Sequence, residues 1–186
     1  RSLFAEGSLT MAFVPTFVKI RQEQGDKAAF VLARSVQLWL ALILGVAVLF
    51  VLLFPKAVTM LIASGFALKR PEMFDLTADL VQICFPYIFF VSGVALCMGL
   101  LNSMGHFLMP ALAPCILNIV LIAASLLAIS VGGNVAVYLA WGALVAGLGQ
   151  WLLQQPILRS KGFSWVGPVD PLGPGVKRIG ALMLPT

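Results

Sequence analysis

The chain has 186 residues, of which 61% are hydrophobic and only 10% carry a charge. Soluble domains carry about 25% charged residues, so this composition excludes an ordinary soluble protein. The net charge of +5 does not indicate nucleic-acid binding, because no alternation of basic and aromatic residues suggests such a surface. We expect an all-α, polytopic membrane helical bundle.

Several apolar runs are long enough to cross a bilayer, which takes about 20 residues in a helix. The first segment, from Arg1 to about Val18, is predicted to be the second part of a span, and Val176–Thr186 the start of another. We therefore expect an internal fragment of a longer protein. Between these two partial spans, complete spans are predicted near residues 35–54, 81–101, 111–131 and 135–157.

The connections between the spans divide into two groups by charge. Residues 19–34, 102–109 and 158–178 hold eight basic residues, whereas residues 55–79 and 130–134 hold three, offset by three acidic ones. Cytoplasmic loops are enriched in Lys and Arg, so we place the first group in the cytoplasm. Its basic residues are Lys19, Arg21, Lys27, Arg34, Arg159, Lys161, Lys177 and Arg178.

Two connecting segments have a distinct composition. Residues 57–68 are apolar but too short to span, and they are predicted to form an interfacial helix on the opposite side. Residues 158–175 form a cytoplasmic connection that is rich in Gly and Pro from Gly162 onward. This composition predicts a non-helical loop that leads towards a second bundle of spans.

The first segment carries two charges close to or inside an apolar run. On a helix, Arg1, Ala5, Ser8 and Ala12 would share one stripe of small and polar residues. Such a stripe leaves room beneath the guanidinium of Arg1, which can bind a phosphate through two hydrogen bonds. Glu6 would lie away from Arg1 and could pair with another helix. The alternative is that Arg1 reaches the membrane interface and Glu6 lies near a helix end.

Prolines and an asparagine mark two of the predicted spans. Pro114 removes a backbone donor inside its span and is expected to bend the helix. Asn118 lies one turn further on and needs a partner at membrane depth. Pro86 predicts a second bent span. Three glutamines near the cytoplasmic end of the last complete span (Gln150, Gln154 and Gln155) are either interhelical hydrogen bonders or ordinary interface residues.

No constellation of residues predicts an enzyme or a metal site. Asp75 and Asp79 share a helix face and could hold Mg²⁺ in a prenyl transferase, but a second acidic cluster is missing, so we interpret them as solvated residues at the start of a span. The three cysteines lack metal-ligand spacing. There is no P-loop, no GxSxG motif and no nucleotide fingerprint. We expect no cofactor in this fragment.

Residues 1–8 (Arg-Ser-Leu-Phe-Ala-Glu-Gly-Ser) and 12–15 (Ala-Phe-Val-Pro) resemble the second-span signature of the MurJ (MviN) family of bacterial lipid II flippases. The family has a second arginine where this chain has Ser2. Later phrases resemble it in order and spacing: residues 85–88, 101–103, 110–114, 117–118 and 150–156.

The resemblance implies a protein of about fourteen spans, arranged in two lobes. This is the MATE-like fold of the MOP exporter superfamily. This chain would hold most of the N-lobe, from the end of span two to the start of span seven. Arg1 would then belong to a cationic cavity that binds the lipid diphosphate, with Ser8 beside it, and Glu6 would lie near the periplasmic gate. The C-lobe would be missing from this chain. In the natural-length protein, sodium or the membrane potential would drive transport.

The predicted function is therefore transport rather than catalysis: a flippase that moves lipid II across the bacterial inner membrane for peptidoglycan synthesis. Its partners would be lipid II, membrane lipid and the cell-wall synthesis machinery, and no nucleic acid. One alternative is a sister MOP-superfamily exporter of drugs or lipid-linked oligosaccharides, with the same fold. Another is a membrane-embedded prenyl or glycosyl transferase, which would need a second acidic pair.

Overall fold

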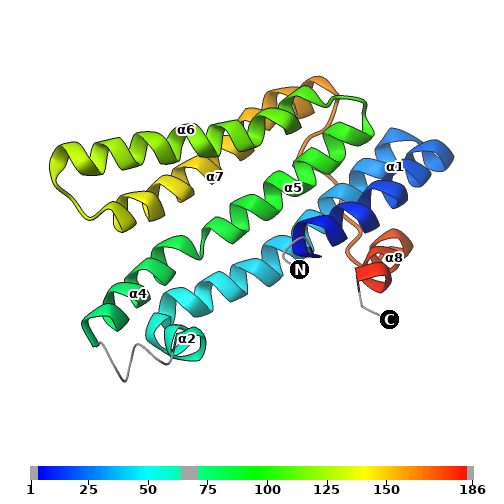
Figure 1. Ribbon diagram of the computed structural model, residues 1–186. Helices are drawn as coiled ribbons and strands as arrows, with labels where there is room; N and C mark the ends of the chain where they lie inside the picture. The colour runs from blue at the N-terminus through cyan, green and yellow to red at the C-terminus, as the bar shows by residue number, and fades with distance from the viewer. Residues whose placement is uncertain (1–3, 64–70, 184–186) are drawn as a thin grey trace.

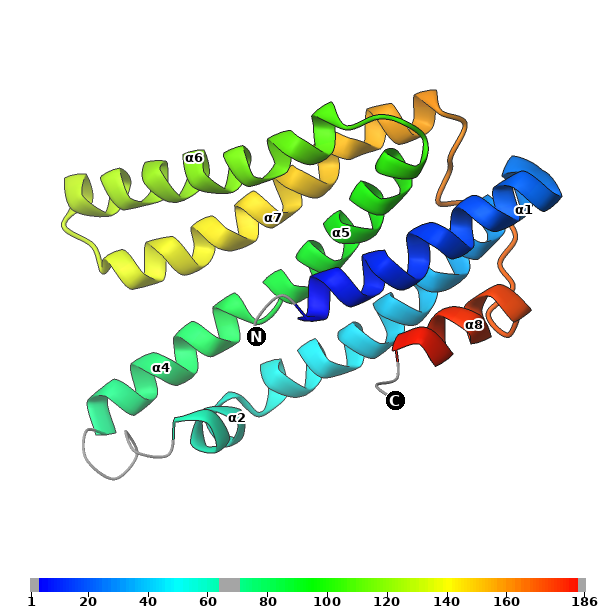
Figure 2. The ribbon, with the colours of Figure 1, turned by 45° about the vertical axis from the view of Figure 1, so that its right-hand side comes forward.

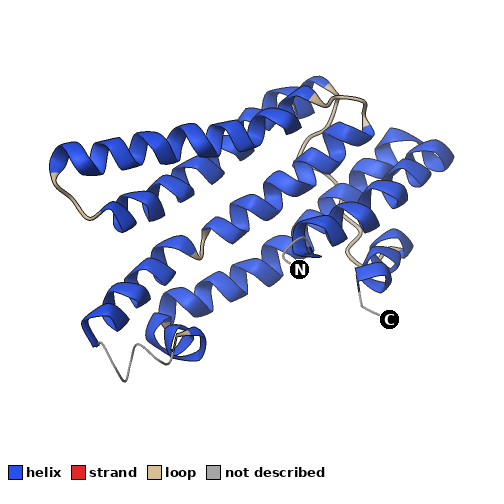
Figure 3. Cartoon of the chain, in the orientation of Figure 1, coloured by secondary structure: helices blue, strands red, loops and turns tan. Residues whose placement is uncertain are grey.

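The computed structural model describes the backbone of residues 4–63 and 71–183 and the side chains of residues 11–63 and 73–182. Within these ranges the chain consists of helices joined by turns and one longer linker, without a strand (Figure 3). The helices are α1 (Phe4–Leu53), α2 (Pro55–Ile62), α4 (Pro71–Cys84), α5 (Tyr87–Ser103), α6 (Leu108–Val131), α7 (Val135–Ser160) and α8 (Pro174–Met183).

Four helical segments are long and apolar enough to cross a membrane. They are Met11–Leu53, Met73–Ser103, Leu108–Val131 and Val135–Ser160. Large apolar side chains are exposed along α6 and the end of α1, for example Ile119 and Val46. Such surfaces suit lipid rather than water, because the backbone polar groups of a helix are satisfied within the helix itself. The all-α, multi-pass membrane bundle predicted from the sequence is confirmed.

Helix α1 is folded back on itself at Gly25. The first limb (residues 4–24) and the second limb (residues 26–53) lie side by side (Figures 1 and 2). Gly25 has φ 84° and ψ 175°, a region that only glycine adopts readily because it lacks a Cβ. Across the turn, Nε of Arg21 lies 2.6 Å from Oδ1 of Asp26. The reversal therefore depends on one glycine inside a polar run.

The connection expected over residues 19–34 is helical except at Gly25. Its helices continue because their inner faces are apolar and find partners across the turn. Phe17 and Phe30 are buried, with ring centroids 6.4 Å apart. Burial of such rings outweighs the modest helix propensity of the polar residues between them. Of the charges that marked this segment as a connection, Lys19 and Lys27 are exposed, whereas Arg34 packs against the linker.

The second spanning segment is broken between α4 and α5 at Phe85 and Pro86. Proline has no N–H to donate within the helix, and the chain passes the break with two short-range bonds. The N–H of Ile88 donates to the carbonyl of Phe85, and that of Phe89 to Pro86, each at 3.1 Å. The helical segment begins at Pro71, before the predicted span.

Helices α6 and α7 form an antiparallel pair (Figure 1). Gly132 closes α6 with φ 70°, a left-handed conformation that suits glycine. Asn134 begins α7, since its Oδ1 accepts a hydrogen bond from the N–H of Ala136 at 3.0 Å. At the contact, a Cβ on Gly142 would lie only 2.9 Å from that of Ala124. Small residues thus allow the close approach of the two helices.

The linker of residues 161–173 is non-helical, as its Gly and Pro content predicts, and it packs against the bundle. Phe163 is 1% exposed and its ring makes an edge contact with that of Phe30 at 5.3 Å. The linker leads into α8, which lies against α1. The described part of α8 is short and is not among the helices that could span a membrane.

The buried core lies at one end of the bundle. It gathers the Gly25 turn, the last turns of α5 and α7, and the linker, and its largest members are Phe13, Phe17, Phe30 and Phe163. The α5–α6 turn lies at the same end, while α2 and the α6–α7 turn lie at the other (Figure 1). The basic connections predicted to be cytoplasmic therefore meet at the well-packed end.

Candidate functional site

The sequence places its main candidate residues at the start of the chain. Arg1 lies outside the described residues. Glu6 and Ser8 lie on the first limb of α1, but their side chains are also outside what the structure describes. The substrate contacts predicted for Arg1 and Ser8, and the gate predicted for Glu6, therefore stay predictions.

The described part of the first limb shows how this helix is held. Of the stripe that would include Arg1 and Ser8, Ala12 is described, and it is 5% exposed within the core. Phe13 on the next position packs towards α5, where a Cβ on Gly99 would lie 3.4 Å from its ring. Met11 is 72% exposed. The first limb is thus fixed against α5 on one side and open on the other.

The two prolines expected to bend helices have different surroundings. Pro86 lies at the break between α4 and α5. Pro114 lies inside α6, and the carbonyl of Ala113 beside it accepts a hydrogen bond from Nε2 of Gln150 at 2.6 Å. A side chain of α7 therefore binds the α6 backbone next to the position where proline interrupts the hydrogen-bond ladder.

Asn118 lies on the exposed side of α6. Within the described ranges it has no hydrogen-bond partner. A polar side chain at this depth of an apolar helix is costly unless it is paired. We therefore expect its partner outside the described residues.

Two of the three glutamines of α7 make hydrogen bonds outside their helix. Gln150 donates to α6 and Gln155 to Sγ of Cys97 in α5, whereas Gln154 donates only to the carbonyl of Gln150 within α7. Gln150, Gln154 and Gln155 are all buried. Gln155 accepts a hydrogen bond from Nε1 of Trp165 at 2.5 Å, which ties the linker to α7. Buried oxygens of Gln150 and Gln154 have no partner in the described part of the chain.

Side chains of the second limb of α1 hold the linker in place. The sequence predicted no such contact for them, because Arg34 was identified only as a basic residue of a connection. Arg34 donates from Nε to the carbonyl of Pro168 at 2.9 Å and from Nη1 to that of Ser164 at 3.1 Å. The N–H of Asp170 donates to Oγ of Ser35 at 2.8 Å. These contacts join positions more than 120 residues apart, so no local signal in the sequence could have found them.

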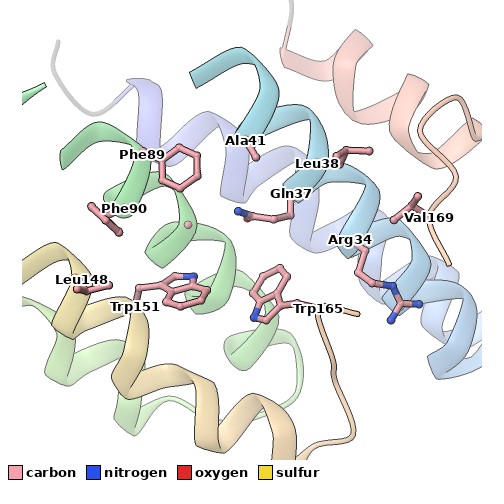
Figure 4. A pocket seen from close by; sticks show the side chains of 11 residues that line it. Arg34, Gln37, Leu38, Ala41, Phe89, Phe90, Leu148, Trp151, Trp165 and Val169 are labelled. Carbon is pink, nitrogen blue, oxygen red and sulfur yellow. The ribbon is translucent and has the colours of Figure 1, made fainter. Parts of the chain in front are cut away.

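A cavity of about 440 Å³ lies between the second limb, α5, α7 and the linker. We call it the Arg34 cavity, and Figure 4 shows Gln37 reaching into it between aromatic rings, with Arg34 at its edge beside the linker. It is open on one side. Its lining residues are Arg34, Gln37, Leu38, Ala41, Phe89, Phe90, Gly93, Leu148, Trp151, Trp165 and Val169.

At the other end of the bundle, Asp75 pairs with Lys56 of α2 at 2.8 Å, and both side chains are largely exposed. The hydrogen bond and the charge of Asp75 raise the pKa of Lys56 above its ordinary 10.5. The pair is therefore formed at neutral pH and is lost as pH rises through the raised pKa of Lys56. Among the described residues, Asp75 and Asp79 belong to no group of His, Cys, Asp and Glu side chains that could hold a metal ion.

The chain is similar to known proteins along its whole length. The family model described as lipid II flippase MurJ matches residues 1–186. The chain is 37% identical over 189 residues to a protein of Rhizobium tropici named probable lipid II flippase MurJ, covering 100% of this chain and 35% of that protein. It is 35% identical over 190 residues to the lipid II flippase MurJ of Burkholderia cenocepacia, covering 100% of this chain and 36% of that protein.

The chain thus spans about a third of the length of the curated relatives that it matches. The family model matches every residue of the chain, and the four helical segments able to cross a membrane agree with it. The chain belongs to the MurJ family of lipid II flippases.

Proposed function

We propose that the natural-length protein is a lipid II flippase. It moves the undecaprenyl-diphosphate-linked peptidoglycan precursor from the inner to the outer leaflet of the bacterial cytoplasmic membrane, without making or breaking a bond. The observation that carries this proposal is the family match over residues 1–186. The apolar helices and the basic end of the bundle support it, because a carrier of a lipid diphosphate needs both a membrane scaffold and positive charge.

The proposed mechanism is alternating access, in which two lobes rock around a central substrate site. The residues of this chain would form one of the lobes. Its packed cytoplasmic end would move as a unit, while the interrupted helices at Pro86 and Pro114 would flex. Arg1 would bind the diphosphate with Ser8 beside it, and Glu6 would act at the gate.

Several elements of the proposal lie beyond this chain. A second lobe would complete the central substrate cavity. Coupling to sodium or to the membrane potential would use residues outside positions 1–186. The cell-wall synthesis machinery, which consumes lipid II, is the proposed protein partner.

The first test is growth rescue. The natural-length gene is expressed in cells depleted of their own lipid II flippase, and growth is scored at matched membrane levels of the protein. We expect rescue by the wild type. Failure of a well-expressed wild type would favour a sister exporter of the same superfamily.

Variants at Arg1 then test the substrate contact. We expect Arg1→Ala to lose rescue, because a buried diphosphate without its cation is strongly disfavoured. Rescue by Arg1→Lys would show that charge suffices without the guanidinium fork. Full rescue by Arg1→Ala would remove Arg1 from the mechanism.

A further inference from the structure

We propose that the Arg34 cavity binds an anionic phospholipid of the cytoplasmic leaflet. The lipid phosphate would contact the guanidinium of Arg34, and one acyl chain would occupy the aromatic interior. The site is separate from the substrate contacts proposed for the first limb of α1, since it is built on the second limb, α5, α7 and the linker.

The first argument is the charge of Arg34. Its Nε and Nη1 donate to carbonyl oxygens of the linker, which position the guanidinium without neutralising it. The ion pairs seen among the described residues leave Arg34 without a carboxylate partner. A guanidinium has five N–H donors, so donors remain for an anion at the edge of the cavity.

The second argument is the apolar interior. Phe89 and Phe90 of α5 and Leu148 of α7 line the cavity. The rings of Trp151 and Trp165 are stacked there, with centroids 6.4 Å apart. Tryptophan is enriched at membrane–water interfaces, where its ring lies at the level of the lipid headgroups. A ligand that fits must therefore carry an anion on an apolar chain.

The third argument is Gln37. Its amide has no hydrogen-bond partner among the described residues, and its Oε1 is buried. Gln37 lies three residues after Arg34, which is about 4.5 Å along a helix. In a glycerophospholipid, ester carbonyls follow the phosphate at this depth. Figure 4 shows Nε2 of Gln37 directed into the cavity, where it would donate to such a carbonyl, and a simple alkyl chain has no oxygen to accept this bond.

The location favours a phospholipid as the occupant. The cavity runs from Arg34 and Trp165, at the end of the bundle where the basic connections meet, towards Phe89 and Leu148 nearer the middle of the bundle. The cytoplasmic leaflet carries anionic lipids that basic segments beside the membrane attract. The open side of the cavity would let such a lipid enter with its second chain remaining in the bilayer.

The test uses the natural-length protein, stripped of lipid in detergent and titrated with phosphatidylglycerol under native mass spectrometry. We expect Arg34→Gln to weaken binding by about tenfold, as for loss of a charged hydrogen bond. The matched control is Arg159→Gln, an exposed arginine at the end of α7 outside the cavity, which should leave binding unchanged. Equal binding by wild type and Arg34→Gln would overturn the proposal.

A second variant guards against a loosened linker in Arg34→Gln. Ala41→Phe would fill the cavity while leaving the bonds of Arg34 to the linker intact, so phosphatidylglycerol binding should be lost with no change in tryptic cleavage of the linker. Unchanged binding in this variant would contradict the proposal, because it would mean that another part of the protein fills the cavity or that the lipid binds elsewhere.

Three further ligands identify the chemistry. Diacylglycerol with the same chains should bind at least tenfold more weakly, because it lacks the phosphate that Arg34 contacts. Inorganic phosphate should not displace the lipid. Arg34-dependent displacement by undecaprenyl diphosphate would assign the cavity to the isoprenoid substrate and overturn the phospholipid proposal. None of these measurements depends on transport, so their outcome is independent of the proposed flippase activity.

Discussion

Gly25 is the residue on which the path of α1 depends. Its backbone lies at φ 84° and ψ 175°, a conformation that costs other residues about 1–3 kcal/mol. Apart from the adjoining backbone, no atom lies within 4 Å of the position of a Cβ there. Any effect of a methyl group at this position would therefore come from backbone strain and not from a clash.

We predict that Gly25→Ala lowers the stability of the natural-length protein by about 1–3 kcal/mol. The measurement is the thermal midpoint in detergent at fixed lipid content. Gly45→Ala is the control, because Gly45 lies in the second limb with equally open space around it and alanine favours a helix. Equal midpoints for Gly25→Ala and the wild type would show that the turn does not need a glycine.

At the scale of elements, the linker is a fixed part of the well-packed end of the bundle and not a free tether. Phe163 anchors it between the ring of Phe30 at 5.3 Å and the ring of Trp165 at 4.7 Å. Arg34 and Ser35 hold its backbone from the second limb of α1. The direction in which the chain enters α8 is therefore set by these contacts.

We predict that Phe163→Ala destabilises this end by about 3–5 kcal/mol, the usual cost of removing a buried ring. The measurement is the rate of tryptic cleavage at Lys161, which is exposed at the start of the linker. We expect faster cleavage in Phe163→Ala and no change in Val166→Ala, because Val166 is 88% exposed. Similar rates in all three proteins would mean that the ring does not hold the linker.

For the whole molecule, the sequence alone predicts the helical membrane bundle well, because apolar run length is a direct physical signal. The turn at Gly25 was missed, since a glycine inside a polar run is also typical of an ordinary connection. The Arg34 cavity was missed because it joins Arg34, Trp151 and Trp165 from distant segments. Long-range packing of this kind leaves no periodic trace in the sequence.

The family is shown by the similarity over residues 1–186, whereas transport by the natural-length protein is the central proposal. The most direct measurement is the amount of lipid II exposed on the outer leaflet of cells depleted of their own flippase, with and without expression of this protein. We expect expression to restore exposure, and Arg1→Ala to leave it at the depleted level. Exposure that stays at the depleted level despite a well-folded, membrane-inserted wild type would contradict lipid II transport.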